Sequence, residues 1–295
     1  MLANLAEPLL DHATLDLAGA RSITYRLDQS FTYEYDAPIT ELRHRFVVVP
    51  PERHGDVYRR EHRVSVSGGD VRRSVRRDSV GNTVVRLRAD RVDHSVTFSV
   101  TAFLERINGC TQTELPGSVL HDPRLLRPTR LTTPDDRLRD LAADAARIPA
   151  ADSLARAEHI CQTVHEAMTY EDGVTSVKTT AAEALAGGRG VCQDFAHVMV
   201  TVCREIGIPA RYVSGHLLGQ GGTHAWMEVV VPARSSGAEA IAFDPCNGRR
   251  AGAGHITVAT GRDYTDVAPT SGTYVGEASG RLTAERRVGV VTVAA

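Results

Sequence analysis

Hydrophobic and polar residues alternate along the first third of the chain, between Ile23 and Leu104. A period of two residues is typical of β-strands that bury one face. The clearest apolar series are Ile23/Tyr25/Leu27, Phe31/Tyr33/Tyr35, Val64/Val66 and Val96/Phe98/Val100/Ala102/Leu104. Turn-forming residues separate these series at Pro50-Pro51, at Ser67-Gly68-Gly69-Asp70 and at Gly81-Asn82. The pattern predicts an all-β domain, either a sandwich or a barrel-like sheet.

The period changes after a stretch that carries four prolines and no periodicity, from Pro116 to Pro134. We interpret this stretch as a connection between domains. Apolar residues then recur at helical spacing over 134–148 and 152–168, which predicts two helices. Thr180 and Glu183 have the spacing of a capping box, and the glycines at 187 and 188 are typical of a helix end. We therefore expect a short third helix.

The last third of the chain predicts one more helix and then strands. Helical periodicity runs from Phe195 to Ile206, where Gly207 and Pro209 stop it. The segments "ARYVSGHLL", "THAWMEVVV" and "AIAFD" follow as strands. We expect an α+β fold, with an N-terminal all-β domain followed by a core of helices packed on an antiparallel sheet. The expected parts are an extension (1–20), the β-rich domain (21–115), a linker (116–133) and a catalytic domain (134–295).

Composition and charge narrow the classes of protein that the chain can be. Of its 295 residues 42% are hydrophobic and 24% charged, and the net charge is −2, so we expect neither a nucleic acid nor a membrane as partner. No apolar run reaches the ~18 residues of a membrane span, and the N-terminus does not resemble a secretory signal, which favours the cytoplasm. The arginine-rich stretch from Arg43 to Arg91 lacks the interleaved aromatic stacking platform that nucleic-acid surfaces usually carry. We expect its arginines to form a solvated strand face.

The five cysteines are odd in number and form no C-x-x-C pair, which argues against a disulfide framework or a cysteine-rich zinc module. Cys161 and Cys203 fall on apolar helix faces, where a thiol usually packs. Cys110 has no evident partner. Cys246 follows Asp244 by two residues, so it has either a packing or a redox role.

Cys192 stands apart from the other four cysteines. It follows a glycine-rich turn in "GRGVCQDFAH" and begins a predicted helix, where unpaired N–H groups and the helix dipole stabilise a thiolate. His224 begins one predicted strand and Asp244 ends the next, and adjacent antiparallel strands bring such positions within reach. These positions predict a Cys–His–Asp relay. In this relay Cys192 attacks a carbonyl carbon, and the backbone N–H of Cys192 stabilises the resulting oxyanion.

A metal-site interpretation of these residues is weaker. A zinc ion held by Cys192, His224, Asp244 and Cys246 would lack the close ligand pairs of structural zinc sites, so we expect no metal and no cofactor. His216 and His255 have no evident function in the pattern and are interpreted as incidental.

Three segments resemble the signature blocks of the transglutaminase-like superfamily: "GRGVCQDFAHVMVTVCREIGIPARYVSGHLLG", "THAWMEVVV" and "AFDPCNG". The resemblance implies a papain-like core with Cys192, His224 and Asp244 as the catalytic triad. It also implies that Tyr170, Gln193 and Trp226 shape the site. "ITYRLDQSFTYEYDAPI", "VVVPP" and "DSVGNTVVRL" resemble the β-rich N-terminal region of bacterial transglutaminase-like proteins. The segment 261–293 is similar to their usual ending, which we expect to close the catalytic domain.

The resemblance implies an acyl-enzyme but leaves the reaction open. We expect hydrolysis of an amide by a cysteine peptidase or amidase, with a peptide, amide or acyl-thioester substrate. An acyltransferase that passes the acyl group to an amine, as in small-molecule biosynthesis, is the alternative. A catalytically silent binding module is a third hypothesis. The sequence does not predict the oligomeric state.

Overall fold

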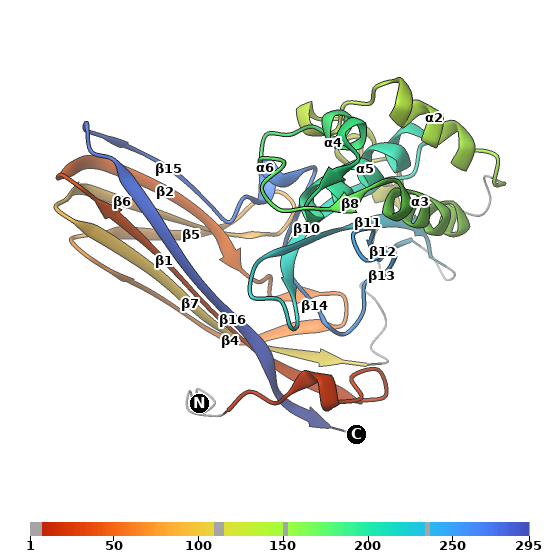
Figure 1. Cartoon of the computed structure of the whole chain (residues 1–295). Helices are drawn as coiled ribbons and strands as arrows, with labels where there is room; N and C mark the ends of the chain where they lie inside the picture. The colour runs from red at the N-terminus through yellow and green to blue at the C-terminus, as the bar shows by residue number, and fades with distance from the viewer. Residues whose placement is uncertain (1–7, 109–114, 150–152, 234–236, 295) are drawn as a thin grey trace.

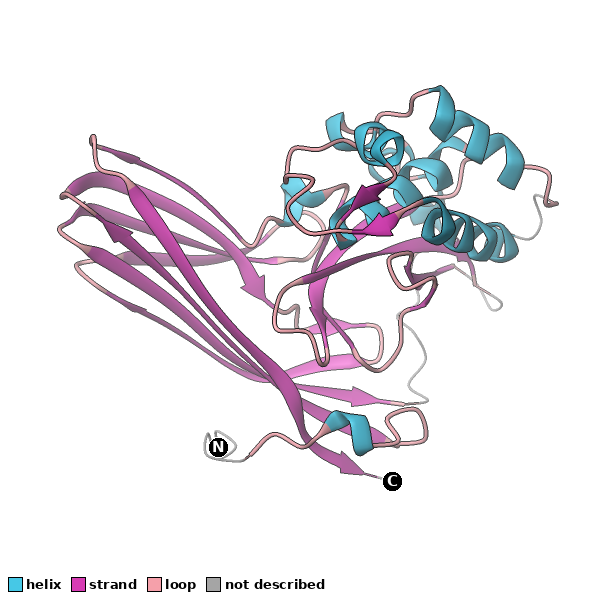
Figure 2. Cartoon of the chain, viewed as in Figure 1, coloured by secondary structure: helices cyan, strands magenta, loops and turns pink. Residues whose placement is uncertain are grey.

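The computed structural model describes residues 8–108, 115–149, 153–233 and 237–294, which fold into a long β-sandwich and a helix-rich domain beside one end of it (Figure 1). All the longer helices gather in the second domain, as Figure 2 shows. No helix in the described part of the chain is long and apolar enough to span a membrane. The α+β class that the sequence predicts is confirmed.

Two antiparallel sheets form the sandwich. The first has the order β16-β1-β7-β4-β3 and the second β15-β2-β6-β5. Their interior is apolar because every second residue of β1 faces inward, and the rings of Phe46 and Phe98 stack with centroids 4.2 Å apart. The strands are β1 (Ser22–Tyr35), β2 (Ile39–Val49), β3 (Arg53–His54), β4 (Val57–Ser67), β5 (Arg72–Arg77), β6 (Thr83–Val92), β7 (Ser95–Ile107), β15 (Thr270–Val275) and β16 (Gly280–Ala294).

The end of the chain belongs to the sandwich, contrary to our expectation that residues 261–293 close the catalytic domain. β15 pairs with β2, and β16 pairs with β1 along its whole length. Val290 of β16 is buried with residues of β1, and Leu10, from the segment expected to be a free extension, forms a bridge with it. Burial of these apolar side chains explains the pairing. The helix-rich domain is therefore inserted between strands of the sandwich.

A central helix, α5 (Cys192–Glu205), organises the helix-rich domain. It is buried nearly all round, between a sheet of order β13-β12-β11-β10-β14 and the helices α2, α3 and α4. The sheet is antiparallel throughout, as the sequence predicts. The remaining bounds are α2 (Asp136–Ala145), α3 (Ser153–Ala167), β8 (Thr169–Tyr170), α4 (Ala181–Gly187), β9 (Arg189–Gly190), β10 (Ala210–Leu217), β11 (His224–Pro232), β12 (Ala238–Asp244), β13 (Arg249–Arg250), β14 (His255–Gly261) and α6 (Tyr264–Val267).

The expected linker is a packed part of the helix-rich domain. It contains η2 (Gly117–His121), α1 (Pro123–Leu126) and η3 (Arg130–Thr132). Arg204 of α5 is buried and donates hydrogen bonds to the Leu125 carbonyl at 3.2 Å and to the Thr132 hydroxyl at 3.2 Å. Because a buried guanidinium needs acceptors for its N–H groups, this contact fixes the segment against α5.

Apolar contacts join the two domains behind the start of α5. Val47 of β2 and Val84 of β6 pack in one cluster with Ala196 and Tyr212, and Cys192 lies at the edge of this cluster. Asn82 adds two hydrogen bonds to the backbone of Thr260, at 2.8 and 2.9 Å. The sandwich thus supports the region in which we expect the active site.

Candidate active site

Cys192 is the first residue of α5, as the sequence predicts, and it is partly exposed. Two short parallel strands lead into it, with Tyr170 of β8 opposite Gly190 of β9. Asp194 closes the first helical turn by accepting hydrogen bonds from Val191 N at 2.8 Å and from Thr175 Oγ1 at 2.6 Å. The N–H of Cys192 belongs to the first turn, where amides have no intrahelical acceptor. The thiol therefore lies at the positive end of the helix dipole.

His224 and Asp244 lie side by side at the end of the sheet. His224 is the first residue of β11, Asp244 is the last residue of β12, and these strands are antiparallel neighbours. The distance from His224 Nε2 to Asp244 Oδ2 is 2.8 Å, and both side chains are almost fully buried. The arrangement that we expect from the strand pairing is thus present.

The thiol of Cys192 completes this group. Burial alone lowers the pKa of His224, but its hydrogen bonds with Asp244 and Cys192 outweigh burial and raise the pKa from 6.5 to about 9. Since Nε2 contacts Asp244, Nδ1 is the ring nitrogen left for the thiol. The imidazole is therefore cationic near neutral pH and lies between a carboxylate and a thiol.

Asp244 accepts hydrogen bonds from three side chains through one oxygen. Besides His224, the Nε2 atom of His255 lies 2.9 Å from Asp244 Oδ2, and Asn247 Nδ2 lies 2.7 Å from it. Burial raises the pKa of this carboxyl, but the hydrogen bonds from His224 and His255 hold it well below its usual range. His255, which we expected to be incidental, is therefore a direct partner of the relay.

Both domains fix His255. Its Nδ1 accepts a hydrogen bond from Gly252 N at 3.0 Å, and its carbonyl accepts one from Arg106 of the sandwich at 3.1 Å. Tyr25 of the sandwich donates to the nearby Ala253 carbonyl at 2.7 Å. A cavity of about 600 Å³ lies between the domains, with His255 and Trp226 in its wall. No local pattern signals these contacts, because residues 245–254 form an aperiodic return from β12 to β14.

The three side chains His224, Asp244 and His255 lie close enough together to invite a metal interpretation, with candidate ligand atoms within 4.8 Å of one another. Their hydrogen bonds do not suit a cation. Because Nδ1 of His255 accepts from Gly252, the neutral ring carries its hydrogen on Nε2, which faces Asp244. Asn247 also presents an N–H group to the same carboxylate oxygen. The absence of a metal stays a prediction, and it is one that this hydrogen-bond pattern supports.

The other described cysteines differ from Cys192. Burial raises the pKa of Cys161 and of Cys246 to about 12, and it also raises the pKa of Cys203. These thiols stay protonated near neutral pH, as packing residues do. Cys110 lies outside the described residues. The Nδ1 atom of His216 lies 3.1 Å from the Gly222 carbonyl oxygen, and no hydrogen bond joins His216 to Cys192, His224 or Asp244 in the described structure.

The three residues expected to shape the site have different positions. Trp226 is fully buried and its ring stacks on His224 with centroids 6.0 Å apart, so it supports the imidazole from behind. Tyr170 is 53% exposed, near Cys192 and Cys246, and its hydroxyl donates to Asp172 at 3.0 Å. Gln193 follows Cys192 in α5 and is 7% exposed. Of these three side chains, Tyr170 alone is exposed to solvent.

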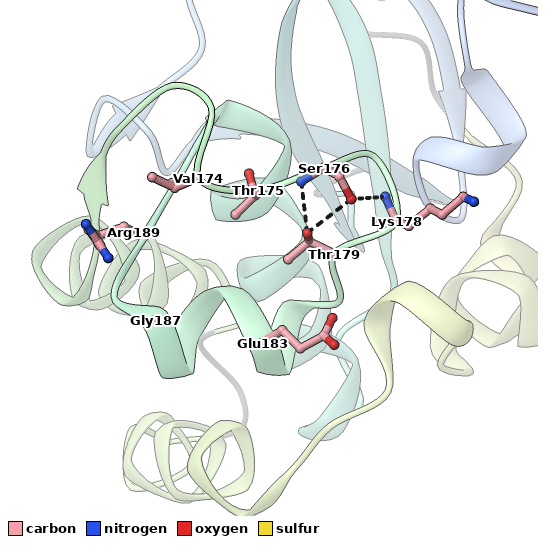
Figure 3. Close-up of a pocket in the computed structure, with 8 residues that line it drawn as sticks. All are labelled: Val174, Thr175, Ser176, Lys178, Thr179, Glu183, Gly187 and Arg189. Atoms are coloured by element: carbon pink, nitrogen blue, oxygen red, sulfur yellow. Dashed lines mark hydrogen bonds between the residues drawn. The ribbon is translucent and has the colours of Figure 1, made fainter.

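The loop after Tyr170 borders a separate depression of about 450 Å³ (Figure 3). Ser176, Thr179 and Lys178 hold the loop in shape through hydrogen bonds such as Ser176 N to Thr179 Oγ1 at 2.9 Å. Neither Cys192 nor His224 nor Asp244 lines this depression. Its connection to the site is structural, because Thr175 of the same loop donates to Asp194.

Comparison with known proteins agrees with this architecture. Residues 140–245 match the transglutaminase-like superfamily, and residues 25–105 match the bacterial transglutaminase-like N-terminal region. An uncharacterized protein of Mycobacterium leprae is 33% identical over 66% of this chain and 72% of its own length. One from Mycobacterium tuberculosis is 27% identical, covering 88% of this chain and 89% of its own.

A crystal structure described as a candidate cysteine protease from Cytophaga hutchinsonii has the same fold. It superimposes with a TM-score of 0.69 at 24% identity, covering 92% of this chain and 91% of that one. A helix-rich domain with a buried His–Asp pair beside a helix-initial cysteine, joined to a β-sandwich, defines the class of protein. The chain belongs to the transglutaminase-like superfamily and carries the N-terminal region of its bacterial members.

Proposed function

We propose that this protein is a thiol enzyme that forms an acyl-enzyme at Cys192 and hydrolyses an amide bond, as a cysteine peptidase or amidase. The observation that carries the proposal is the buried 2.8 Å contact between His224 and Asp244 beside a thiol at a helix N-terminus. Superfamily membership supports a cysteine-dependent enzyme in general. That water, and not an amine, accepts the acyl group is a further part of the proposal.

The proposed reaction needs no group beyond these side chains and water. The Cys192 thiolate attacks the substrate carbonyl carbon, and the carbonyl electrons move to oxygen near the N–H of Cys192. The C–N bond then breaks, and the His224 imidazolium gives its proton to the leaving amine. Water attacks the thioester while His224 takes a proton from it, which releases the acid and restores the thiolate. Asp244 holds the imidazole in its tautomer throughout.

The first test is alkylation of Cys192 by iodoacetamide as a function of pH, measured by peptide mass spectrometry. Because the pKa of His224 is raised to about 9, we expect a reactive thiolate–imidazolium pair well below pH 8. His224→Ala should remove this reactivity at low pH. If Cys192 in folded protein reacts like Cys246 and ignores the His224 substitution, the enzyme proposal is wrong and the binding-module hypothesis gains.

Turnover of a panel of amide and thioester substrates decides between hydrolysis and transfer. Hydrolysis predicts release of the free acid at a rate that added amine does not change. Formation of an amide product at the expense of the acid, rising with the amine concentration, would replace the hydrolase with an acyltransferase. The same assay in Cys192→Ala measures the background. We propose the cytoplasm as the location, and neither a nucleic acid nor a membrane as partner.

A further inference from the structure

The second sheet of the sandwich carries arginines in register across three strands. On its outer face Arg43 of β2 lies opposite Arg88 of β6, and Arg88 lies opposite Arg72 of β5. In the next row Arg45 lies opposite Arg86. We call this surface the arginine face and define it by Arg43, Arg45, Arg72, Arg76, Arg86 and Arg88. As Figure 2 shows, no helix covers the part of the sandwich that extends away from the helix-rich domain.

The side chains of three of these six arginines have no partner in the described part of the protein. Arg72 pairs with Asp90 at 2.5 Å, Arg43 pairs with Glu41 at 3.2 Å, and Arg45 donates to a backbone carbonyl, that of Asp266. Within the described structure the side chains of Arg76, Arg86 and Arg88 make no hydrogen bond or ion pair. Like charges directly opposite each other destabilise a sheet. A chain of net charge −2 thus concentrates unpaired positive charge on one surface.

Protection of a sheet edge explains only part of this pattern. β5 is an edge strand, and charged side chains on an edge prevent pairing with another molecule. This accounts for Arg72 and Arg76. It does not account for Arg86, Arg88, Arg43 or Arg45, because β6 and β2 are interior strands with a neighbour on each side.

The shape of the face points to a ligand that lies along the strands. Two shallow depressions of about 440 and 420 Å³ lie on it and share Arg86 and Arg88 as their common wall. Side chains two residues apart on one strand repeat every ~6.8 Å, which is also the repeat of alternate side chains in an extended peptide. An arginine fork binds a carboxylate through two N–H groups. His44 is the one aromatic side chain among the described residues that line the two depressions, and it is buried, so a stacking platform for bases is missing.

We propose that the arginine face is a docking site for an extended acidic polypeptide segment, in which every second residue is glutamate or aspartate. The proposal rests on the arrangement of charge in the sandwich and is independent of the chemistry at Cys192. A peptide held here would lie on the same sheet that packs, through Val47 and Val84, beside Cys192. The face would bring such a chain to the enzyme without adding a catalytic group.

The test measures binding of a fluorescein-labelled (Glu-Ser)8 peptide to the full chain by anisotropy, at 50 and 300 mM NaCl. The variant Arg86→Thr/Arg88→Thr keeps β-forming side chains on an interior strand. We expect its affinity for the peptide to fall about tenfold or more, because two charge-assisted contacts are lost. The matched control is Arg281→Thr/Arg287→Thr, which removes two exposed arginines from β16 of the opposite sheet. Its affinity should stay within about twofold of the wild type.

Three outcomes would overturn the proposal. The first is no measurable binding of the peptide to the wild-type chain at 50 mM NaCl. The second is an equal loss in both double variants, which would assign binding to overall charge. The third is tighter binding of a 16-nucleotide oligo(U) or of phosphatidylglycerol vesicles than of the peptide, which would assign the face to nucleic acid or membrane. Circular dichroism of both variants verifies that the sandwich is folded.

Discussion

Two sheets of this protein hold charged side chains in opposite ways. In the sheet beside α5 the buried carboxylates have partners: Glu228 pairs with His54 and Arg211, and Asp244 with His224, His255 and Asn247. In the second sheet of the sandwich the arginines are exposed and face one another. Buried charge needs partners because desolvation is costly, whereas water tolerates unpaired charge. Pairing therefore distinguishes a preorganised site from a surface available to a ligand.

The largest expected effect is that of Cys192→Ala. It should reduce turnover of an amide or thioester substrate to the background level, because the nucleophile is lost. The melting temperature should stay within a few degrees of the wild type, since the thiol lies at the edge of its cluster. Parallel assays of turnover and thermal unfolding measure both effects. Residual turnover above a tenth of the wild type would remove Cys192 from the mechanism.

His224→Ala should cost more activity than Asp244→Asn. The first substitution removes the base, while the second keeps a group that can still hold the imidazole; we expect the second loss to be about ten- to a hundredfold smaller. Steady-state kcat/KM of the two variants gives the comparison. Equal losses accompanied by equal loss of folding would show that the three residues are a structural cluster only.

Glu228→Gln tests whether the buried ion pairs of Glu228 also stabilise the contact between the two domains. Glu228 lies 2.6 Å from His54 of the sandwich and 2.6 Å from Arg211, and its substitution should cost about 3 kcal/mol of unfolding free energy. The matched control is Glu158→Gln at the exposed pair with Arg250, which should cost less than about 1 kcal/mol. Urea denaturation measures both variants. A cost for Glu228→Gln no larger than the control's would show that its partners contribute nothing.

The same carboxylate predicts a pH dependence of stability. Burial raises the pKa of Glu228, but the charges of Arg211 and His54 outweigh burial and hold it below 4.5. Its contribution is therefore complete above about pH 4.5 and falls as the pH drops through the folded-state pKa. Unfolding free energies between pH 6 and 3 should decline less steeply in Glu228→Gln than in the wild type.

His255→Phe tests whether the hydrogen bond from His255 to Asp244 contributes to activity. Loss of one donor should raise the pKa of Asp244 and weaken its hold on His224, with about a tenfold loss in kcat and little change in KM. The acid limb of Cys192 alkylation should move to higher pH, a change that a purely structural residue would not produce. His255→Gln, which can donate the same hydrogen bond, should recover part of the activity.

The smallest effect belongs to the arginine face. Removal of repulsion in Arg86→Thr/Arg88→Thr should raise the unfolding free energy by about 0.5 kcal/mol. Arg281→Thr/Arg287→Thr should leave it unchanged. Urea denaturation at low salt resolves the difference, and 1 M NaCl should abolish it by screening. Destabilisation of the first variant would mean that the arginines have stabilising partners.

Local patterns were enough to predict where the three proposed catalytic residues lie in the fold. The glycine turn and helical period placed Cys192 at a helix start, and the strand boundaries placed His224 next to Asp244. The capping box of Thr180 and Glu183 is present as predicted. These features depend on residues a few positions apart or on neighbouring strands, where spacing carries the information.

Contacts between distant parts of the chain were not predictable in this way. β16 pairs with β1 across more than 200 residues, and its alternation fits a sheet of either domain. His255 reaches Asp244 only because an aperiodic segment returns to the far edge of the sheet. The register that aligns Arg43 with Arg88 likewise depends on how two strands pair. Each case needed the three-dimensional arrangement.

The pairing of β1 with β16 has a consequence for how the protein is made. During synthesis β1 leaves the ribosome more than 200 residues before the strand that completes its sheet. The helix-rich domain, encoded between them, has all of its sheet strands available before β16 emerges. Until β16 is synthesised, one edge of β1 stays unpaired, so completion of the sandwich is a late step of folding. The helix-rich domain can therefore fold before the sandwich is complete.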